Sequence, residues 1–187
     1  MAELATGHLK GLTNGAALVL GSGLGGGIII NGKLFQGSHF QAGELTFLLP
    51  LQMEKLDPSL MQETTLSAIG LITKVNEILA SLDLKDGLLA FKAINAKKEA
   101  VYPIFETYCR NLAITILNLQ TIFDMETFVL GGGISAQSIL IEEVNRQFDK
   151  VHHEIDFIGK IIKRPKIVAC HHNGTNLIGA AYFLKQG

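Results

Sequence analysis

A glycine-dense stretch near the start of the chain, 21-GSGLGGG-27, constrains the fold more than any other feature. Five of its seven residues are glycine, and it follows an apolar run over residues 16–20 that predicts a short buried strand. The residues after it, 28–30, are β-branched and favour extended structure. Asn31-Gly32 then predicts a two-residue hairpin turn with a return strand over residues 33–35. The first forty residues therefore predict a β-meander that contains a glycine loop.

The chemistry of this loop has two interpretations. Gly21, Gly23 and Gly26 match the G-x-G-x-x-G pattern of dinucleotide-binding loops, but such a loop must open a helix, and this one leads into a hairpin. An NAD site is therefore disfavoured. A glycine loop between two strands still presents backbone N–H groups to a phosphate. Either Gly21, Ser22, Gly23, Gly25 and Gly26 bind a nucleotide phosphate, or the loop is a tight hairpin without a ligand.

A second glycine cluster, Gly131, Gly132 and Gly133, follows an apolar run over residues 127–130 that predicts another buried strand. A helix is predicted after it, over residues 136–151, with Ser135 as its N-cap. Glycine here lets the backbone pack against a flat ligand such as an adenine ring, although a close strand-to-helix turn explains it equally well. Two such loops on one chain favour a nucleotide cleft.

The remaining segments complete an α/β order of elements. Further helices are predicted over residues 1–9, 63–82, 86–96, 97–123 and 173–184, and a last strand over residues 167–170. Residues 36–58 read as irregular because glycine and proline interrupt them. At 187 residues with 48% hydrophobic content, the chain predicts one ordinary domain.

Composition excludes several classes of protein. The 16 basic and 17 acidic residues nearly cancel, so nucleic acid is not expected as a partner of this piece. No apolar run approaches the roughly 20 residues that span a bilayer, and the start lacks the pattern of a secretion signal. The two cysteines form no C-x-x-C pair, which fits a reduced cytoplasmic setting. Neighbouring histidines at 152–153 and 171–172 do not point the same way, so no metal site is predicted.

Four segments resemble the ROK (repressor, open reading frame, kinase) family in the order in which that family carries them. They are 21-GSGLGGGIIINGKL-34, 42-AGE-44, 129-VLGGGIS-135 and 176-NLIGAA-181. The resemblance implies an RNase-H-like, actin-like ATPase fold and ATP-dependent phosphorylation of a hexose or hexose derivative, with Mg²⁺ accompanying the nucleotide. It implies that the two glycine clusters bind nucleotide, that Glu44 and Glu63 bind sugar, and that the protein is a homodimer. From composition alone, a glutamate such as Glu44 is more often a solvated loop acid than a ligand, and only the resemblance favours the sugar-binding role.

Two departures from the family pattern matter. The family's E-N-D-x-N segment, whose Asp is the catalytic base, and its D-x-G-G-T phosphate loop are both absent. The resemblance therefore implies a C-terminal half, residues 1–187, that lacks an N-terminal domain and is inactive alone. Phe47 stands where many members have a zinc-binding His, and residues 50–65 contain no cysteine, so no zinc is expected. The alternatives are a ROK transcriptional regulator, whose upstream helix-turn-helix would bind DNA, and a catalytically dead scaffold.

Overall fold

The computed structural model describes residues 1–48, 66–154 and 157–171. Two earlier predictions, the sugar ligand Glu63 and the helix over residues 173–184, lie outside the described residues, as does the 176-NLIGAA-181 segment. The described elements run in the order α1 (Ala2–Thr6), β1 (Gly15–Leu20), β2 (Leu24–Ile30), β3 (Lys33–Phe35), η1 (Leu45–Phe47), α3 (Ala68–Ile78), α4 (Gly87–Asn95), α5 (Tyr102–Phe123), β4 (Thr127–Gly132), α6 (Ser138–Glu154), α7 (Ile158–Ile161) and β5 (Lys166–Ala169).

The strands form one mixed sheet in the order β3-β2-β1-β4-β5. The meander β1-β2-β3 is antiparallel, whereas β1, β4 and β5 run parallel. The predicted hairpin at Asn31-Gly32 is confirmed, and both residues have positive φ, 53° and 72°, as a two-residue turn of this kind requires. The parallel strands are joined through helices, so the mixed α/β architecture predicted from the sequence is also confirmed.

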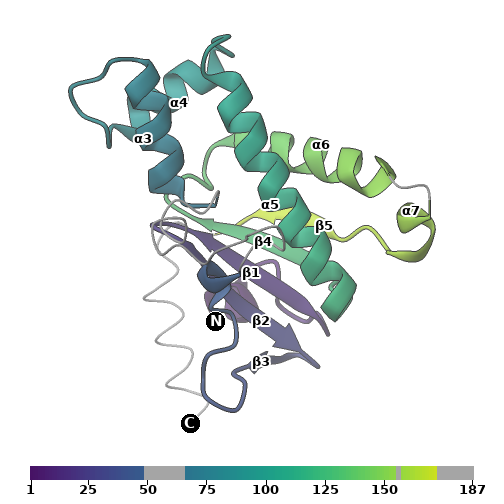
Figure 1. Cartoon of the computed structure of the whole chain (residues 1–187). Helices are drawn as coiled ribbons and strands as arrows, with labels where there is room; N and C mark the ends of the chain where they lie inside the picture. Colours follow the sequence, from purple (N-terminus) through teal and green to yellow (C-terminus); the bar gives the residue numbers. More distant parts are fainter. Residues whose placement is uncertain (49–65, 155–156, 172–187) are drawn as a thin grey trace.

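Alternation along β1 divides the core between the two faces of the sheet. Ala16, Leu18 and Leu20 are buried on the face that carries the larger core, together with the apolar side chains of α5 and α6. Ala17 contributes to a smaller cluster on the opposite face, around Leu9 and Ile29. Figure 1 shows α5 and α6 lying along the sheet, with α3 and α4 beyond one end of α5. Among the described residues, none of the helices has the length and apolar character that crossing a membrane requires.

Three helix starts differ from the predictions by two residues or more. The helix predicted over residues 63–82 begins at Ala68, after its N-cap Ser67, and ends at Ile78. The helix predicted from residue 97 begins at Tyr102, because Pro103 occupies its first turn, where a residue without an N–H is tolerated. The helix predicted from residue 136 begins at Ser138. Ser135 is not its N-cap: the hydroxyl of Ser135 donates a hydrogen bond to the carbonyl of Gly132, 2.8 Å away, and so closes the turn before the helix. The short helices η1 and α7 were not predicted.

Candidate functional site

The two glycine clusters lie at the same edge of the sheet. The first cluster follows β1, and the second begins with the last two residues of β4. These two strands are adjacent and parallel, so their carboxyl ends meet, with Leu20 paired to Gly132. Gly132 has φ of +100°, and a Cβ there would lie 2.1 Å from the carbonyl oxygen of Leu20. Only glycine fits this conformation and spacing. Glycine at position 132 therefore allows the ends of β1 and β4 to approach closely, so that the two glycine clusters can share one nucleotide cleft.

The first glycine loop is shorter than the sequence indicated. β2 already begins at Leu24, so Gly25 and Gly26 pair with Val19 and Leu18 of β1 instead of lying in the loop. Burial of Leu24, 1% exposed, holds the strand in this register. The loop between the strands is reduced to residues 21–23, closed by a hydrogen bond from the Gly21 N–H to the Gly23 carbonyl at 3.0 Å.

The N-terminus of α3 abuts this loop. The side chain of Ser67 caps the helix by accepting a hydrogen bond from the Gly70 N–H at 3.0 Å. The N–H of Ala68 donates to the carbonyl of Gly21 at 2.9 Å. The loop therefore lies beside the positive end of a helix dipole, where negative charge is stabilised.

The loop that carries Glu44 docks on the edge of β2 through Thr46. The Thr46 hydroxyl accepts from the N–H of Leu24 at 2.9 Å and donates to the carbonyl of the same residue at 3.1 Å. Gly43, with φ of +94°, allows the loop to approach Gly26 so closely that a Cβ would lie 2.1 Å from its carbonyl oxygen. Sequence analysis missed Thr46, because its partner lies 22 residues earlier in the chain.

A cleft of about 410 Å³ lies between the glycine strands and the start of the chain. Four predicted site residues line it: Gly25, Gly26, Glu44 and Gly131. Exposed Glu44 contributes a carboxylate at its wall. The other predicted glycines, with Ser22, do not line it but lie at the ends of the neighbouring strands. Met1 and Glu3 also line the cleft, although neither was predicted as a site residue.

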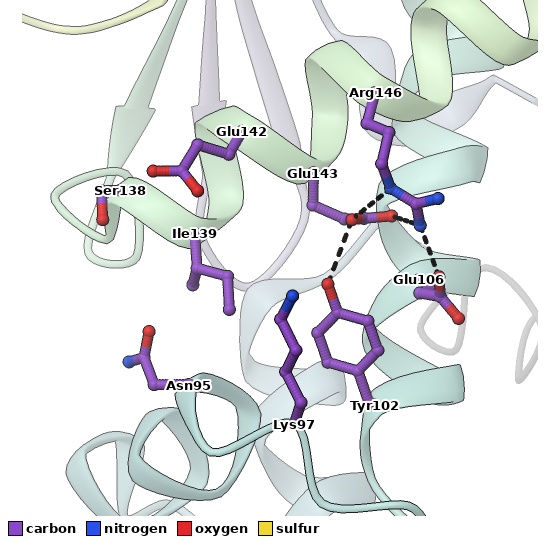
Figure 2. A pocket seen from close by; sticks show the side chains of 9 residues that line it. All are labelled: Asn95, Lys97, Tyr102, Glu106, Ser138, Ile139, Glu142, Glu143 and Arg146. Carbon is purple, nitrogen blue, oxygen red and sulfur yellow. Dashed lines mark hydrogen bonds and ion pairs between the residues drawn. The ribbon is translucent and has the colours of Figure 1, made fainter.

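A second cleft, of about 500 Å³, lies between the α4–α5 turn and α6 (Figure 2). None of the predicted site residues that the structure describes lines it. Its wall is a network centred on Glu143, which accepts from the Tyr102 hydroxyl at 3.1 Å and from Arg146 Nε at 2.8 Å. Arg146 also pairs with Glu106.

Protonation in this second cleft follows from those contacts. Burial, together with the charge and hydrogen bond of Glu143, raises the pKa of Tyr102 to about 12. Burial acts to raise the pKa of Glu143 as well, but hydrogen bonds from Arg146 and Gln147 outweigh it and hold that pKa below its ordinary value. The ionised network ties α5 to α6.

The histidine pairs do not converge. The Nε2 of buried His152 contacts the carbonyl oxygen of Ile162 at 2.7 Å, and the Nδ1 of His153 contacts that of Asp149. The His171 ring packs edge-on against His8, and His172 lies outside the described residues. Residues 1–48, 66–154 and 157–171 contain no cluster of three or more His, Cys, Asp or Glu side chains able to hold a metal.

The model of the ROK family matches residues 1–187. The chain belongs to the ROK family. It is 29% identical over 194 residues to the N-acetyl-D-glucosamine kinase of Vibrio cholerae, covering 95% of this chain and 60% of that protein. The chain thus spans about three fifths of the length of the curated relatives that it matches.

Solved structures agree with this assignment. A ROK family protein from Streptococcus pneumoniae in complex with sucrose superposes with a TM-score of 0.76 at 29% identity, covering 100% of this chain and 63% of that one. A ROK glucokinase from Streptomyces griseus, in complex with glucose and AMPPNP, superposes with a TM-score of 0.80 at 21% identity, covering 100% and 65%. The family and the actin-like fold predicted from the sequence are confirmed.

Proposed function

We propose that this chain is the nucleotide- and sugar-binding half of an ATP-dependent sugar kinase. The observation that carries the proposal is the convergence of three loops at one edge of the sheet: the glycine loop after β1, the glycine cluster after β4, and the loop bearing Glu44. Ligands of α/β sheets bind at the carboxyl ends of the strands. The kinase relatives and the bound AMPPNP of the Streptomyces griseus glucokinase support the same conclusion.

The nucleotide would be held chiefly by backbone. The loop over residues 21–23 would offer backbone N–H groups to the phosphates. The N-terminus of α3 would add its helix dipole, because the N–H groups of Ala68, Ile69 and Gly70 already donate within the protein. The cluster Gly131–Gly132–Gly133 offers a flat surface to the adenine. Among the described residues lining the cleft, only Glu3 and Glu44 carry carboxylates, and both oxygens of Glu3 already accept backbone hydrogen bonds. Mg²⁺ would therefore be coordinated mainly by phosphate oxygens and water, and would neutralise phosphate charge.

Glu44 would bind the sugar. It is exposed, lies in a loop held by Gly43 and Thr46, and faces the cleft with a carboxylate able to accept hydrogen bonds from two hydroxyl groups. Glu63, the second predicted sugar ligand, stays a prediction.

In the proposed reaction, a sugar hydroxyl oxygen attacks the γ-phosphorus, the bond to the β-γ bridging oxygen breaks, and ADP leaves. The hydroxyl proton passes to a base in an N-terminal half of the same protein. This half contributes positioning and charge stabilisation, the main components of phosphoryl-transfer catalysis. The domain division, the cytoplasmic location and the absence of zinc belong to the proposal.

A homodimer is part of the same proposal. On the long helix α5, Ile122 is 69% and Ile114 36% exposed, so apolar side chains remain uncovered on a helix that otherwise packs in the core.

The test is a sugar panel assayed with ATP and the full-length protein. Hexoses, N-acetylated hexosamines and β-glucosides would each be scored for sugar-dependent ADP release, with a contaminating kinase excluded by an Asp-to-Asn change at the predicted base. Release with at least one sugar is expected. Sugar binding without any ADP release, together with binding of operator DNA by an upstream domain, would favour the transcriptional regulator instead.

A further inference from the structure

Glu3 is a buried carboxylate with an unusual set of partners. It lies in the five-residue helix α1, near the start of the chain, and is 5% exposed. Its Oε2 accepts the N–H of His8 and its Oε1 accepts the N–H of His171, each at 2.9 Å. None of the ion pairs formed by the described residues includes Glu3. The two backbone donors therefore compensate for part of the cost of burying this charge.

The surrounding chain is shaped around this carboxylate. Gly7 follows one turn later, and a Cβ at its position would lie 2.1 Å from Oε2 of Glu3. The carbonyl of Glu3 also accepts the N–H groups of Gly7 and Leu9, which ends α1 and turns the chain toward β1. The main chain and side chain of Glu3 thus fix the end of this helix together.

The two donors belong to opposite ends of the described chain. His8 follows α1, whereas His171 follows β5 and is separated from Glu3 by 168 residues. Glu3 itself lines the cleft that Gly25, Gly26 and Glu44 also line. The side chain of Glu3 therefore joins α1 to the end of β5 at the candidate active site, next to the ring contact between His8 and His171.

We propose that Glu3 is a positioning residue for phosphoryl transfer. It holds α1, and with it the chain at Met1, in place relative to the glycine strands and Glu44. Both of its oxygens accept hydrogen bonds from backbone, so the role assigned to it is to hold the chain and not to bind sugar or nucleotide. The inference rests on the proposed kinase function. An apolar side chain would fill this buried position at lower cost than a charge, and the positioning role accounts for the carboxylate.

Glu126 provides a matched control. Its Oε1 likewise accepts two backbone N–H groups, from Thr13 at 2.9 Å and Asn14 at 3.2 Å. It precedes β4 and binds the residues before β1, so it lies at the opposite ends of these strands from the cleft. A variant at Glu126 removes comparable hydrogen bonds without reaching the site.

The experiment compares Glu3→Gln, Gly7→Ala and Glu126→Gln in the full-length protein. Glutamine retains one acceptor but places an N–H₂ group against a backbone donor. Gly7→Ala displaces the carboxylate and keeps its charge. For both we expect kcat with sugar to fall on the order of ten- to a hundredfold, since small misplacements near reacting groups have effects of this size. The KM for ATP should stay within about twofold, because the glycine loops are untouched.

For Glu126→Gln we expect a lower melting temperature and unchanged kinetics. If Glu3→Gln does not fold, Gly7→Ala decides. The proposal is overturned if the two cleft variants match Glu126→Gln in kcat, or if KM for ATP rises in parallel with the loss of kcat and of thermal stability. A wild-type protein that releases no ADP with any sugar overturns the proposed function and this inference with it, whereas an active wild type with unaffected variants overturns this inference alone.

Discussion

The two clefts of this molecule use their polar groups in opposite ways. In the cleft between α5 and α6, side chains bind one another: Glu143 accepts from Tyr102 and Arg146, and Arg146 pairs with Glu106 (Figure 2). In the glycine-walled cleft, glycines present bare backbone and Glu44 is exposed; these glycines are Gly25, Gly26, Gly27, Gly43 and Gly131. The larger and more charged cleft is therefore structural, because its hydrogen bonds already join two helices. The smaller one retains groups that a ligand can use.

The largest effect expected from this comparison is complete inactivity of the isolated chain. We propose that the base that accepts the sugar hydroxyl proton belongs to an N-terminal half outside residues 1–187, and general base catalysis contributes factors on the order of a hundred to ten thousand. Sugar-dependent ADP release should be undetectable, while weak nucleotide binding survives. The measurement is a coupled ADP assay on the purified chain. Turnover that persists when contaminating kinase has been removed would contradict the division of roles.

A side chain at Gly21 should block the nucleotide. Nothing lies within 4 Å of a Cβ at this position, so Gly21→Val places bulk in open space beside the loop and not in the core. In the full-length protein we expect ATP affinity to fall about a hundredfold, equivalent to about 2.7 kcal/mol, with little change in melting temperature. Titration calorimetry with AMPPNP measures the change in nucleotide affinity.

Gly23→Val is a less clean variant of the same loop. A Cβ at Gly23 would lie 2.4 Å from the hydroxyl oxygen of Thr46, so it would also disturb the loop that carries Glu44. We expect this variant to weaken both sugar and nucleotide binding. Unchanged ATP affinity in Gly21→Val would instead indicate that the loop is a tight hairpin that binds no ligand.

Glu44→Ala should weaken sugar use by roughly ten- to a hundredfold in kcat/KM, because charged hydrogen bonds contribute about 1.5–3 kcal/mol each. ATP affinity and melting temperature should change little, since the side chain is exposed. Steady-state kinetics with varied sugar provide the measurement, and Thr46→Val, which loosens the same loop, is the comparison. A variant that keeps its sugar kinetics but loses stability would identify Glu44 as a structural loop residue.

The smallest effects belong to the charged cleft and concern stability alone. Tyr102→Phe removes one hydrogen bond to Glu143 and should lower the free energy of unfolding by about 1 kcal/mol, without altering ATP or sugar kinetics. Denaturant unfolding of the variant and the wild type measures the difference. Loss of ATP affinity in Tyr102→Phe would assign this cleft a ligand.

The same cleft predicts a pH dependence. The pKa of Glu143 is lowered in the folded protein, so its contribution to stability is fully present above its unfolded pKa. That contribution is lost as the pH falls through the folded value. Glu143→Gln should therefore remove part of the acid sensitivity of unfolding, which denaturant midpoints between pH 3 and 7, a range of about the ordinary carboxyl pKa and above, would detect.

Local patterns in the sequence were sufficient for the elements that local physics controls. Asn31-Gly32 specified its hairpin because both residues tolerate positive φ, and the apolar run before Gly21 specified β1. Pro103 indicates the start of α5, because proline is favoured in the first turn of a helix, but the helical spacing of the residues before it predicted an earlier start. The glycine loop is shorter than the sequence predicts. Composition does not show that Leu24 is buried opposite Leu20 and begins β2.

By itself, the sequence determined the family, the mixed α/β order and the three segments of the proposed site. Only the tertiary structure decided how these segments meet: that Thr46 closes the edge of β2, that Gly43 and Gly132 allow close backbone approach, and that Glu3 reaches His171. The physical reason is the separation along the chain between the groups that interact. Turn conformations and strand periodicity depend on neighbours within a few residues, whereas hydrogen bonds spanning 22 or 168 residues depend on which backbone groups the folded sheet leaves available.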